Sequence, residues 1–495
     1  MCISSIALWG AVSSFLLGSE SGGGRPDDRA GDKLPSSAPA GAAPVLIDWI
    51  HANDFSMIGL QPETYEYHVI CGSRRGFQFL ASRGVAAEYV TEGPLTLERL
   101  KPHKLLFVNL VSAEREPFLV SEILAIKSFV WQGGSLFVVT DHTNAYFHSH
   151  RLKPLFTELG IESSTVSACD VPPRSLGGHG WITVTRFQPH PVTAGVECLA
   201  MQTGGCVDAR YAVALTSEQS WADEWQVAAY GEGGGMGFFG NFARDPGERQ
   251  GPLGIVLAKN FGQGRIAVVA DQNMIADLFL HYADNYRLWL NIMAWLLRDE
   301  RVQQAEPYLR WQSPLVALYE QYDQPAFGRS DERGYYHAFS LINRYYWAFA
   351  NDRPPEYADL IVLARNAYAL PPGPLAALSR HLRRGRNILV LRAGGDVLRD
   401  EGGVVRCLLR ELGVRNAVTR QTPAGMRIEL PSQGSIHLLR PEVGVENTVL
   451  VPPITPPNEE ERQRGELLLE AVRHALGKGG KAGSPEMQRH AIKPR

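Results

Sequence analysis

Cysteine motifs are missing from this chain of 495 residues. Its six cysteines form no Cys-x-x-Cys pair and show no spacing typical of a zinc site. Structural zinc modules are therefore excluded. Cys198 and Cys206 are close enough in sequence to form a disulfide if this region is exported, and buried free thiols are the alternative.

A strong net charge is also missing. The formal charge of −3 leaves no electrostatic footprint for nucleic acid, so we expect no nucleic-acid partner. The glycine-rich stretch Gly231–Gly237 lacks the Gly-Lys-Ser/Thr sequence of a phosphate-binding loop, and we expect a surface loop there. No pattern in the chain predicts a cofactor.

The chain has no long apolar run. Ile3–Gly18 is apolar but shorter than the roughly 20 residues of a spanning helix, and no Lys or Arg precedes it. The following stretch, Ser21–Ala43, has the Gly, Pro and Ser content of a flexible linker. We expect residues 1–43 to form a signal or anchor segment with its linker, and the protein to be membrane-associated or exported. The alternative is a misassigned start codon before a cytoplasmic protein.

What the chain does have is a strong α/β pattern around residues 132–144. Gly133-Gly134 precedes the apolar run Ser135–Val139, which is typical of a central strand covered on both faces. Helical patterns flank this strand over residues 117–131 and 146–159. The alternation predicts a doubly wound, mostly parallel sheet, whose ligands lie beyond the carboxyl ends of the strands.

The same order of elements occurs twice along the chain. The first copy covers residues 44–301 and the second covers residues 302–476, where Leu315–Tyr319 resembles Val45–Trp49. Agreement in both order and spacing predicts tandem flavodoxin-like α/β domains, the second one degenerate. Residues 477–495 are locally basic and predicted to be a disordered tail.

Four pieces of the first copy together resemble the class I glutamine-amidotransferase-like superfamily, in its non-catalytic, membrane-associated branch. They are Gly133–Asn144, His190–Val196, Gly262–Asp271 and Asn285–Leu297. That branch includes domains of unknown function and gliding-motility-associated ABC-transporter auxiliary proteins. The resemblance implies a flavodoxin-like fold and a place in a membrane or cell-envelope assembly.

The chain departs from that superfamily at one decisive position. Catalytic members carry a nucleophilic cysteine on the turn after the strand equivalent to Ser135–Val139. Here the turn holds Asp141 and His142, with no cysteine nearby. Because glutamine hydrolysis needs an activated thiolate, the sequence argues against amidotransferase activity. The chain also has no Gly-x-Ser-x-Gly motif that would indicate a serine hydrolase.

Polar residues that follow two predicted strands make up the candidate ligand site. One strand is Ser135–Val139, and the other closes a predicted β-hairpin over residues 254–270. The candidates are Asp141, His142, Thr143, Asn144, Asp271 and Asn273. Flat polar side chains at such a place suit a saccharide or a peptide. Alternatively, Asp141 and Asn144 cap the next helix while His142 bonds locally.

A metal site is the third interpretation of this cluster. His142, His148 and His150, with Asp141 and Asp271, offer the imidazole and carboxylate groups that bind zinc or iron. His148 and His150 are two residues apart, which suits a loop or strand but splays the rings on a helix. This interpretation predicts a hydrolase in which Asp141 and His142 are central.

Together these patterns favour a non-catalytic binding or scaffolding component of a cell-envelope or transporter-associated assembly, with protein partners. Tandem domains offer a wide surface for such partners. The rival is a metal- or His-dependent hydrolase that acts on a saccharide or an amide. Enzymatic activity other than glutamine hydrolysis therefore stays an open question at this point.

Overall fold

The computed structural model describes residues 42–52, 72–225, 240–277, 279–302, 314–366, 370–394, 396–423, 425–431, 433–440, 443–444, 446–447 and 459–477. The predictions for residues 1–41, 231–237 and 478–495 lie outside this set. Within the set, no helix is both long enough and apolar enough to cross a membrane. The chain forms two compact units, one from β1 (Val45–Asp48) to α7 (Asn285–Leu297) and one from β13 (Leu315–Tyr319) to α11 (Glu459–Leu476).

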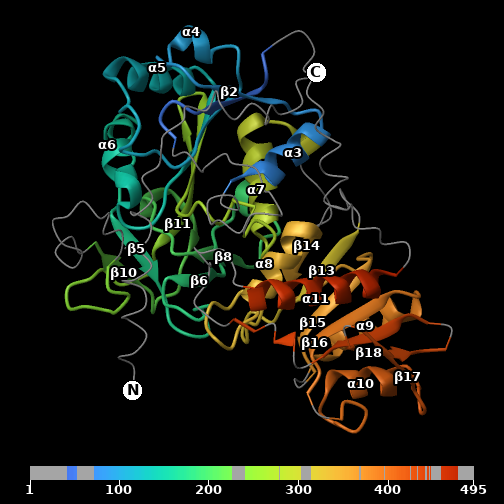
Figure 1. Cartoon of the computed structure of the whole chain (residues 1–495). Coiled ribbons are helices and arrows are strands. Elements are labelled where there is room, and N and C mark those ends of the chain that lie inside the picture. The colour runs from blue at the N-terminus through green and yellow to red at the C-terminus, as the bar shows by residue number, and fades with distance from the viewer. Residues whose placement is uncertain are drawn as a thin grey trace. The chain divides into compact units, whose positions relative to one another are not determined.

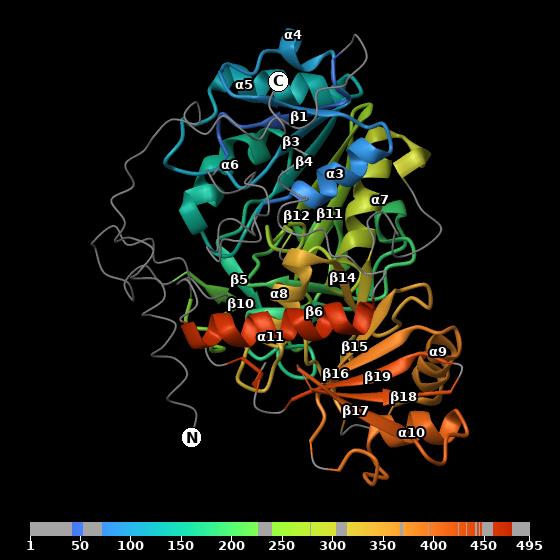
Figure 2. The ribbon, with the colours of Figure 1, turned by 45° about the vertical axis from the view of Figure 1, so that its right-hand side comes forward.

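The first unit is built on an eight-stranded sheet (Figures 1 and 2). Its first five strands are parallel and the last three add antiparallel pairings. The spatial order is β2 (Ala87–Val90), β1, β3 (Leu105–Val108), β4 (Ser135–Val139), β12 (Gly264–Val269), β11 (Gly254–Phe261), β9 (Ala212–Leu215) and β7 (Arg186–Phe187). The parallel part has the flavodoxin-like order, in which the second strand lies outside the first.

Helices cover both faces of this sheet (Figure 2). On one face, α3 (Arg74–Ser82) and α7 enclose an aromatic cluster in which Trp289 packs edge-on against Phe77 and Phe107. The other face carries α5 (Val120–Trp131) and α6 (His148–Glu158). Strands β3 and β4 are buried along their whole length and are apolar except for Ser135, whose hydroxyl donates to the carbonyl oxygen of Leu296 at 2.7 Å.

Between residues 166 and 224 the first unit adds two small antiparallel pairs. One joins β5 (Val166–Cys169) to β10 (Trp221–Glu224), and the other joins β6 (Trp181–Val184) to β8 (Leu199–Gln202). The cysteines there are free and buried, including Cys198 and Cys206, so the disulfide alternative does not hold.

The second unit repeats the plan with seven strands. Its order is β14 (Trp347–Asn351), β13, β15 (Leu360–Arg365), β16 (Asn387–Arg392), β19 (Ser435–Leu439), β18 (Gly425–Glu429) and β17 (Val418–Thr422). Again the first five strands are parallel and the remainder antiparallel. Its helices are α8 (Tyr336–Tyr345), α9 (Pro372–Arg383), α10 (Val404–Glu411) and α11. The prediction of tandem, doubly wound α/β units is confirmed.

Local predictions met different outcomes. The hairpin over residues 254–270 is confirmed as β11 and β12. The helix expected from residue 146 begins instead at His148, after a 3-10 turn over Ala145–Phe147. Tyr146 and Phe147 have φ values of 52° and 60°, so the chain changes direction before the α-helix starts.

Candidate functional site at the ends of β4 and β12

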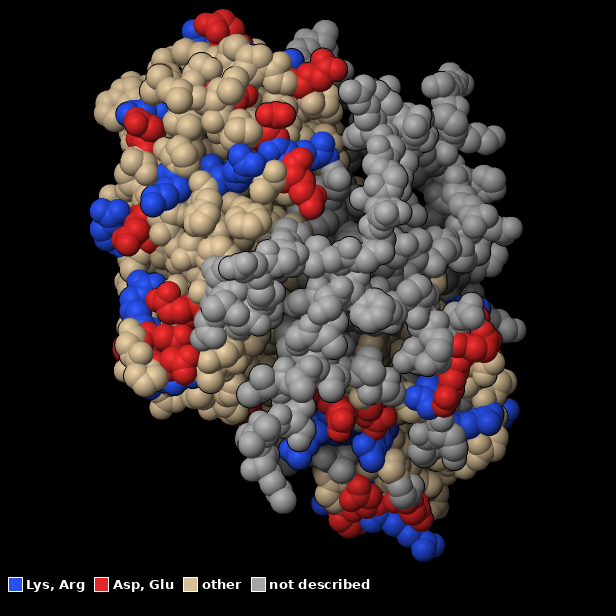
Figure 3. Space-filling view, turned by 60° about the vertical axis from the view of Figure 1, so that its left-hand side comes forward, with Lys and Arg blue, Asp and Glu red and all other residues tan. Residues whose placement is uncertain are grey.

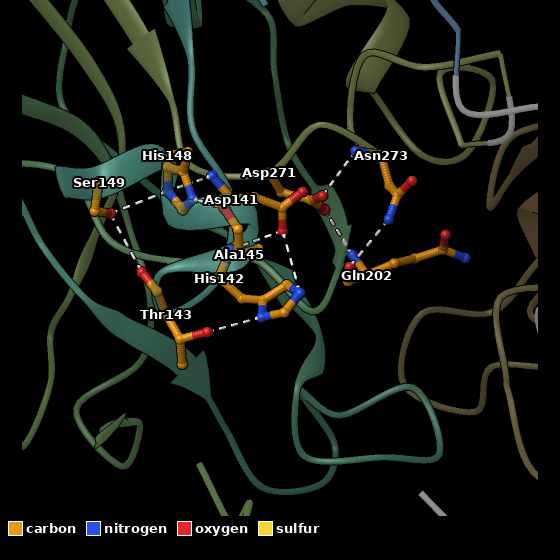
Figure 4. A network of polar contacts seen from close by, with 9 residues as sticks. All are labelled: Asp141, His142, Thr143, Ala145, His148, Ser149, Gln202, Asp271 and Asn273. Carbon is orange, nitrogen blue, oxygen red and sulfur yellow. Dashed lines mark hydrogen bonds and ion pairs between the residues drawn. The ribbon is translucent and has the colours of Figure 1, made fainter. Parts of the chain in front are cut away.

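Strands β4 and β12 are adjacent and parallel, with Val139 opposite Val269. The polar residues that follow them therefore leave the sheet at the same edge. The structure brings Asp141, His142, Asp271 and Asn273 together there (Figure 4).

Asp141 and Asp271 form a pair of neighbouring carboxyl groups (Figure 4). Asp271 is fully buried and accepts hydrogen bonds from the backbone N–H groups of Gln202 and Asn273, each at 2.7 Å. Burial raises the pKa of Asp271 to about 7. Burial, and then the nearby Asp271, raise the pKa of Asp141 well above its usual value. The pair therefore retains a proton near neutral pH.

His142 contacts Asp141, one of the two carboxyl groups in this pair. Its Nε2 atom lies 3.7 Å from Asp141 Oδ1, and its Nδ1 atom lies 3.1 Å from Thr143 Oγ1. Its backbone N–H donates to Asp141 Oδ1 at 2.7 Å. The side chains of His142 and Asp141 remain 12% and 10% exposed, so both are mostly but not completely buried.

His148 is buried, and both of its ring nitrogens form hydrogen bonds with backbone groups. Its Nε2 accepts the backbone N–H of Asp141 at 3.2 Å, and its Nδ1 donates to the carbonyl oxygen of Ala145 at 2.7 Å. Burial lowers the pKa of His148 to about 4, so the ring is neutral. These bonds fix the loop that carries Asp141, and they remove His148 from the possible metal ligands.

Asn144 and His150 also interact within the loop. Asn144 Oδ1 accepts the backbone N–H of His150 at 3.3 Å, in the first turn of α6, and Asn144 Nδ2 lies 3.2 Å from His150 Nδ1. The capping alternative thus describes Asn144 but not Asp141, whose carboxylate bonds to the backbone N–H groups of His142 and Gln272. Within the described part of the chain, no three His, Cys, Asp or Glu side chains are grouped as a metal site.

The turn after β4 is strained at Thr143. This buried, β-branched residue has φ of 43°, in the left-handed region that such residues rarely occupy. Its carbonyl oxygen accepts a bond from Ser149 Oγ at 3.2 Å, and its N–H donates to Val166 O at 3.0 Å. The surrounding bonds hold Asp141 and His142 in one place.

Sequence reasoning missed the loop that closes the site from the other side. A Cβ atom on Gly204 would lie 2.7 Å from Asp271 Cβ, and one on Gly205 would lie 2.4 Å from the carbonyl oxygen of Asp141. The loop therefore approaches both acidic residues more closely than a side chain allows. The adjacent Gly-Gly pair was the available signal.

Cysteine chemistry does not replace the missing nucleophile at this edge. Cys206 follows the two glycines, but burial raises the pKa of its thiol to about 12. The thiol is therefore protonated at neutral pH and unreactive.

No family model matches the chain, and no curated protein matches it. The solved structures that resemble about half of it include the mmIFT52 N-terminal domain (16% identity, 51% of this chain, 97% of that chain, TM-score 0.35). They also include a putative ThuA-like protein from Bacteroides uniformis (14%, 53%, 95%, 0.31) and a cytoplasmic protein from Salmonella typhimurium LT2 (11%, 51%, 98%, 0.30). These likenesses carry no argument about function.

Proposed function

We propose that the chain is a non-catalytic binding or scaffolding protein, and that the outer side of α5 is a surface for a protein partner. The resemblance to the non-catalytic amidotransferase-like branch supports a cell-envelope or transporter-associated assembly as the setting. The apolar segment Ile3–Gly18 supports membrane association or export.

The exposed side of α5 carries this proposal. Leu119, Val120, Leu124 and Trp131 are 53%, 73%, 49% and 59% exposed, and we call these four residues the α5 face. They account for four of the seven exposed large apolar side chains in the described residues. Positions 120, 124 and 131 recur on one side of the helix. Clustered apolar exposure of this kind marks interaction surfaces.

The surroundings of the α5 face suit a protein partner better than a partner that carries a high charge of one sign. Lys127, on the same side of the helix, is paired with Glu158 of α6 at 2.7 Å. Figure 3 turns the side on which α5 and α6 are labelled toward the viewer, and its charges are of both signs with uncharged surface between them. A central apolar patch with a mixed polar rim is the usual anatomy of a protein interface.

Site-specific photocrosslinking in the native host tests the proposal. A benzophenone amino acid replaces Val120 in the full chain, and the control carries it at Arg399, which is 89% exposed in the second unit. We expect one recurring protein adduct at position 120 that Leu124→Glu removes. Equal labelling from both positions, or none from position 120, would contradict a partner on the α5 face.

The Asp141–Asp271 pair favours a second candidate, a hydrolase that acts on a saccharide or an amide. One carboxyl group that keeps a proton beside one that can lose it is an acid–base arrangement. The test is turnover of p-nitrophenyl glycosides and p-nitroanilides by the wild type, Asp141→Asn and His142→Ala. Turnover lost in both variants would support the hydrolase, and turnover kept in both would remove this site from the reaction.

A further inference from the structure

The second unit contains a cleft of about 620 Å3. Its walls are the end of β13 with the loop after it (residues 319–324), the loop after β14 (residues 352–356) and the first turns of α9 (residues 371–377). These segments follow three neighbouring parallel strands, at their carboxyl ends. The strand order reverses between β13 and β15, so the cleft lies where doubly wound sheets hold their ligands, and its volume is that of a small-molecule site.

The polar side of the cleft is suited to hydroxyl groups. Gln321 and Gln324 offer amides, and Asp323 and Asp352 offer carboxylates. The Tyr319 hydroxyl forms a hydrogen bond with Gln321 and lies close enough to Asp323 and Asp352 for their charges to raise its pKa, after burial as the main cause. Carboxylates accept hydrogen bonds while amides and hydroxyls both donate and accept, which matches a ligand with many hydroxyl groups.

The charge balance argues against an anionic ligand. Arg353 is the one cation among the described lining residues, and Asp323 and Asp352 add two carboxylates to the lining. The lining Glu356 is already neutralised by Arg380 and Arg384, at 2.7 and 2.9 Å. With Arg380 and Arg384 counted, three carboxylates stand beside three guanidinium groups, so a phosphate or carboxylate ligand would meet no excess of positive charge here.

The rest of the lining is flat and apolar. Tyr322 contributes an aromatic ring, and Pro354, Pro374 and Ala377 contribute aliphatic surface. A sugar ring has apolar C–H faces and a rim of hydroxyl groups, so it matches this combination of surfaces. We propose that this cleft binds a neutral saccharide of one or two rings.

This site is separate from the α5 face and from the Asp141–Asp271 pair, which both belong to the first unit. Its test therefore stands or fails independently of the proposed function. The first turn of α9 provides a way to block it. A Cβ atom on Gly373 would meet no heavy atom within 4 Å, so Gly373→Trp adds a large side chain at the cleft wall without a backbone clash.

Saturation-transfer difference NMR on the full chain tests this proposal. The probes are maltose, cellobiose, lactose and diacetylchitobiose. A lysine- and proline-rich decapeptide is tested in parallel as the alternative ligand. The matched control is Gly402→Trp, where the nearest heavy atom to the added Cβ is Asp400 Oδ1 at 3.7 Å. We expect at least one disaccharide to bind, about tenfold more weakly in Gly373→Trp and within about twofold of wild type in Gly402→Trp. Asp323→Asn, an exposed and isosteric change, is expected to weaken binding as well. The proposal is overturned if no disaccharide gives a signal, if Gly373→Trp binds like wild type, or if only the peptide binds.

Discussion

His51 Nδ1 lies 2.8 Å from Asp48 Oδ2, and both side chains are buried at the end of β1. On its other side, His51 Nε2 lies 3.5 Å from Glu122 Oε2 in the first turn of α5. Glu122 also accepts the backbone N–H groups of Leu95 and Leu119, each at 2.8 Å. One histidine between two carboxylates thus ties β1 to the start of the helix that carries the α5 face.

Replacing this histidine should destabilise the first unit most at low pH. Burial alone would lower the pKa of His51, but the hydrogen bond and charge of Asp48, then Glu122, raise it above 6.5 overall. A raised pKa means that the stabilisation is fully present below pH 6.5 and is lost as pH rises through the folded-state value. We expect His51→Gln to cost about 3–5 kcal/mol at pH 6, because two buried carboxylates lose their partner.

Urea unfolding at pH 6 and pH 9, followed by tryptophan fluorescence, measures this loss. The control is His150→Gln, an exposed position where a change within about 0.5 kcal/mol is expected. A loss in His51→Gln that is the same at both pH values would show that the ring is uncharged in the folded protein.

The acidic pair should also lower the stability of the protein as pH rises, over a more acidic range. The pKa of Asp271 is raised to about 7 and that of Asp141 is raised well above its usual value, so the folded state holds protons that the unfolded state releases near pH 4. Wild-type stability should therefore fall as pH rises from about 4 to about 7. In Asp141→Asn this fall should be smaller by roughly 1 kcal/mol, because one buried negative charge is gone.

Thermal unfolding from pH 4 to pH 8 tests this expectation. The exposed Glu98→Gln on α4 (Leu97–Leu100) serves as control, and it should keep the wild-type slope. Parallel pH profiles for the wild type and Asp141→Asn would be incompatible with a pair that holds a proton.

The glycine loop beside the pair should tolerate no side chain. Gly205→Ala would place Cβ 2.4 Å from the carbonyl oxygen of Asp141 and 3.2 Å from that of Val166. Both contacts are to backbone, so the loop after β4 must move, and we expect a loss of about 1–3 kcal/mol. Gly402→Ala, in open surroundings, is the matched control for calorimetry. Unchanged stability in Gly205→Ala would mean that the two loops do not touch.

Metal removal should leave the protein unchanged. Both ring nitrogens of His148 bind backbone groups, which leaves His142 and His150 without the third histidine of the predicted set. We expect no stoichiometric zinc or iron in protein purified without chelators, and no shift in the melting temperature with EDTA. His148→Ala should instead cost about 1–3 kcal/mol through the two lost hydrogen bonds. One equivalent of metal in the wild type that disappears in His142→Ala would contradict this prediction.

The sequence predicted the elements whose apolar pattern is continuous. Strand β4 and the β11–β12 hairpin are buried over most or all of their length, so pattern and structure coincide. The convergence of Asp141 and Asp271 also follows from parallel neighbouring strands.

Other features depended on information that a linear pattern does not contain. The start of α6 is set by positive φ at Tyr146 and Phe147, neither of which is a glycine or asparagine. The role of His148 depends on which backbone groups reach its ring in three dimensions. The cleft of the second unit is made by two separate loops and the first turns of α9, so no single motif marked it.

The pairing of β12 with β4 has a consequence for how the first unit is made. Arg265 of β12 lies opposite Ser135 of β4. Strand β4 therefore lacks this neighbouring strand until the ribosome has added about 130 more residues. At ~5–20 residues per second, the ribosome leaves that edge open for on the order of ten seconds. The corresponding delay is shorter in the second unit, because Ile388 of β16 pairs with Ile436 of β19, which follows it much sooner in the chain. During translation the first unit therefore exposes an unpaired strand edge for longer than the second unit does.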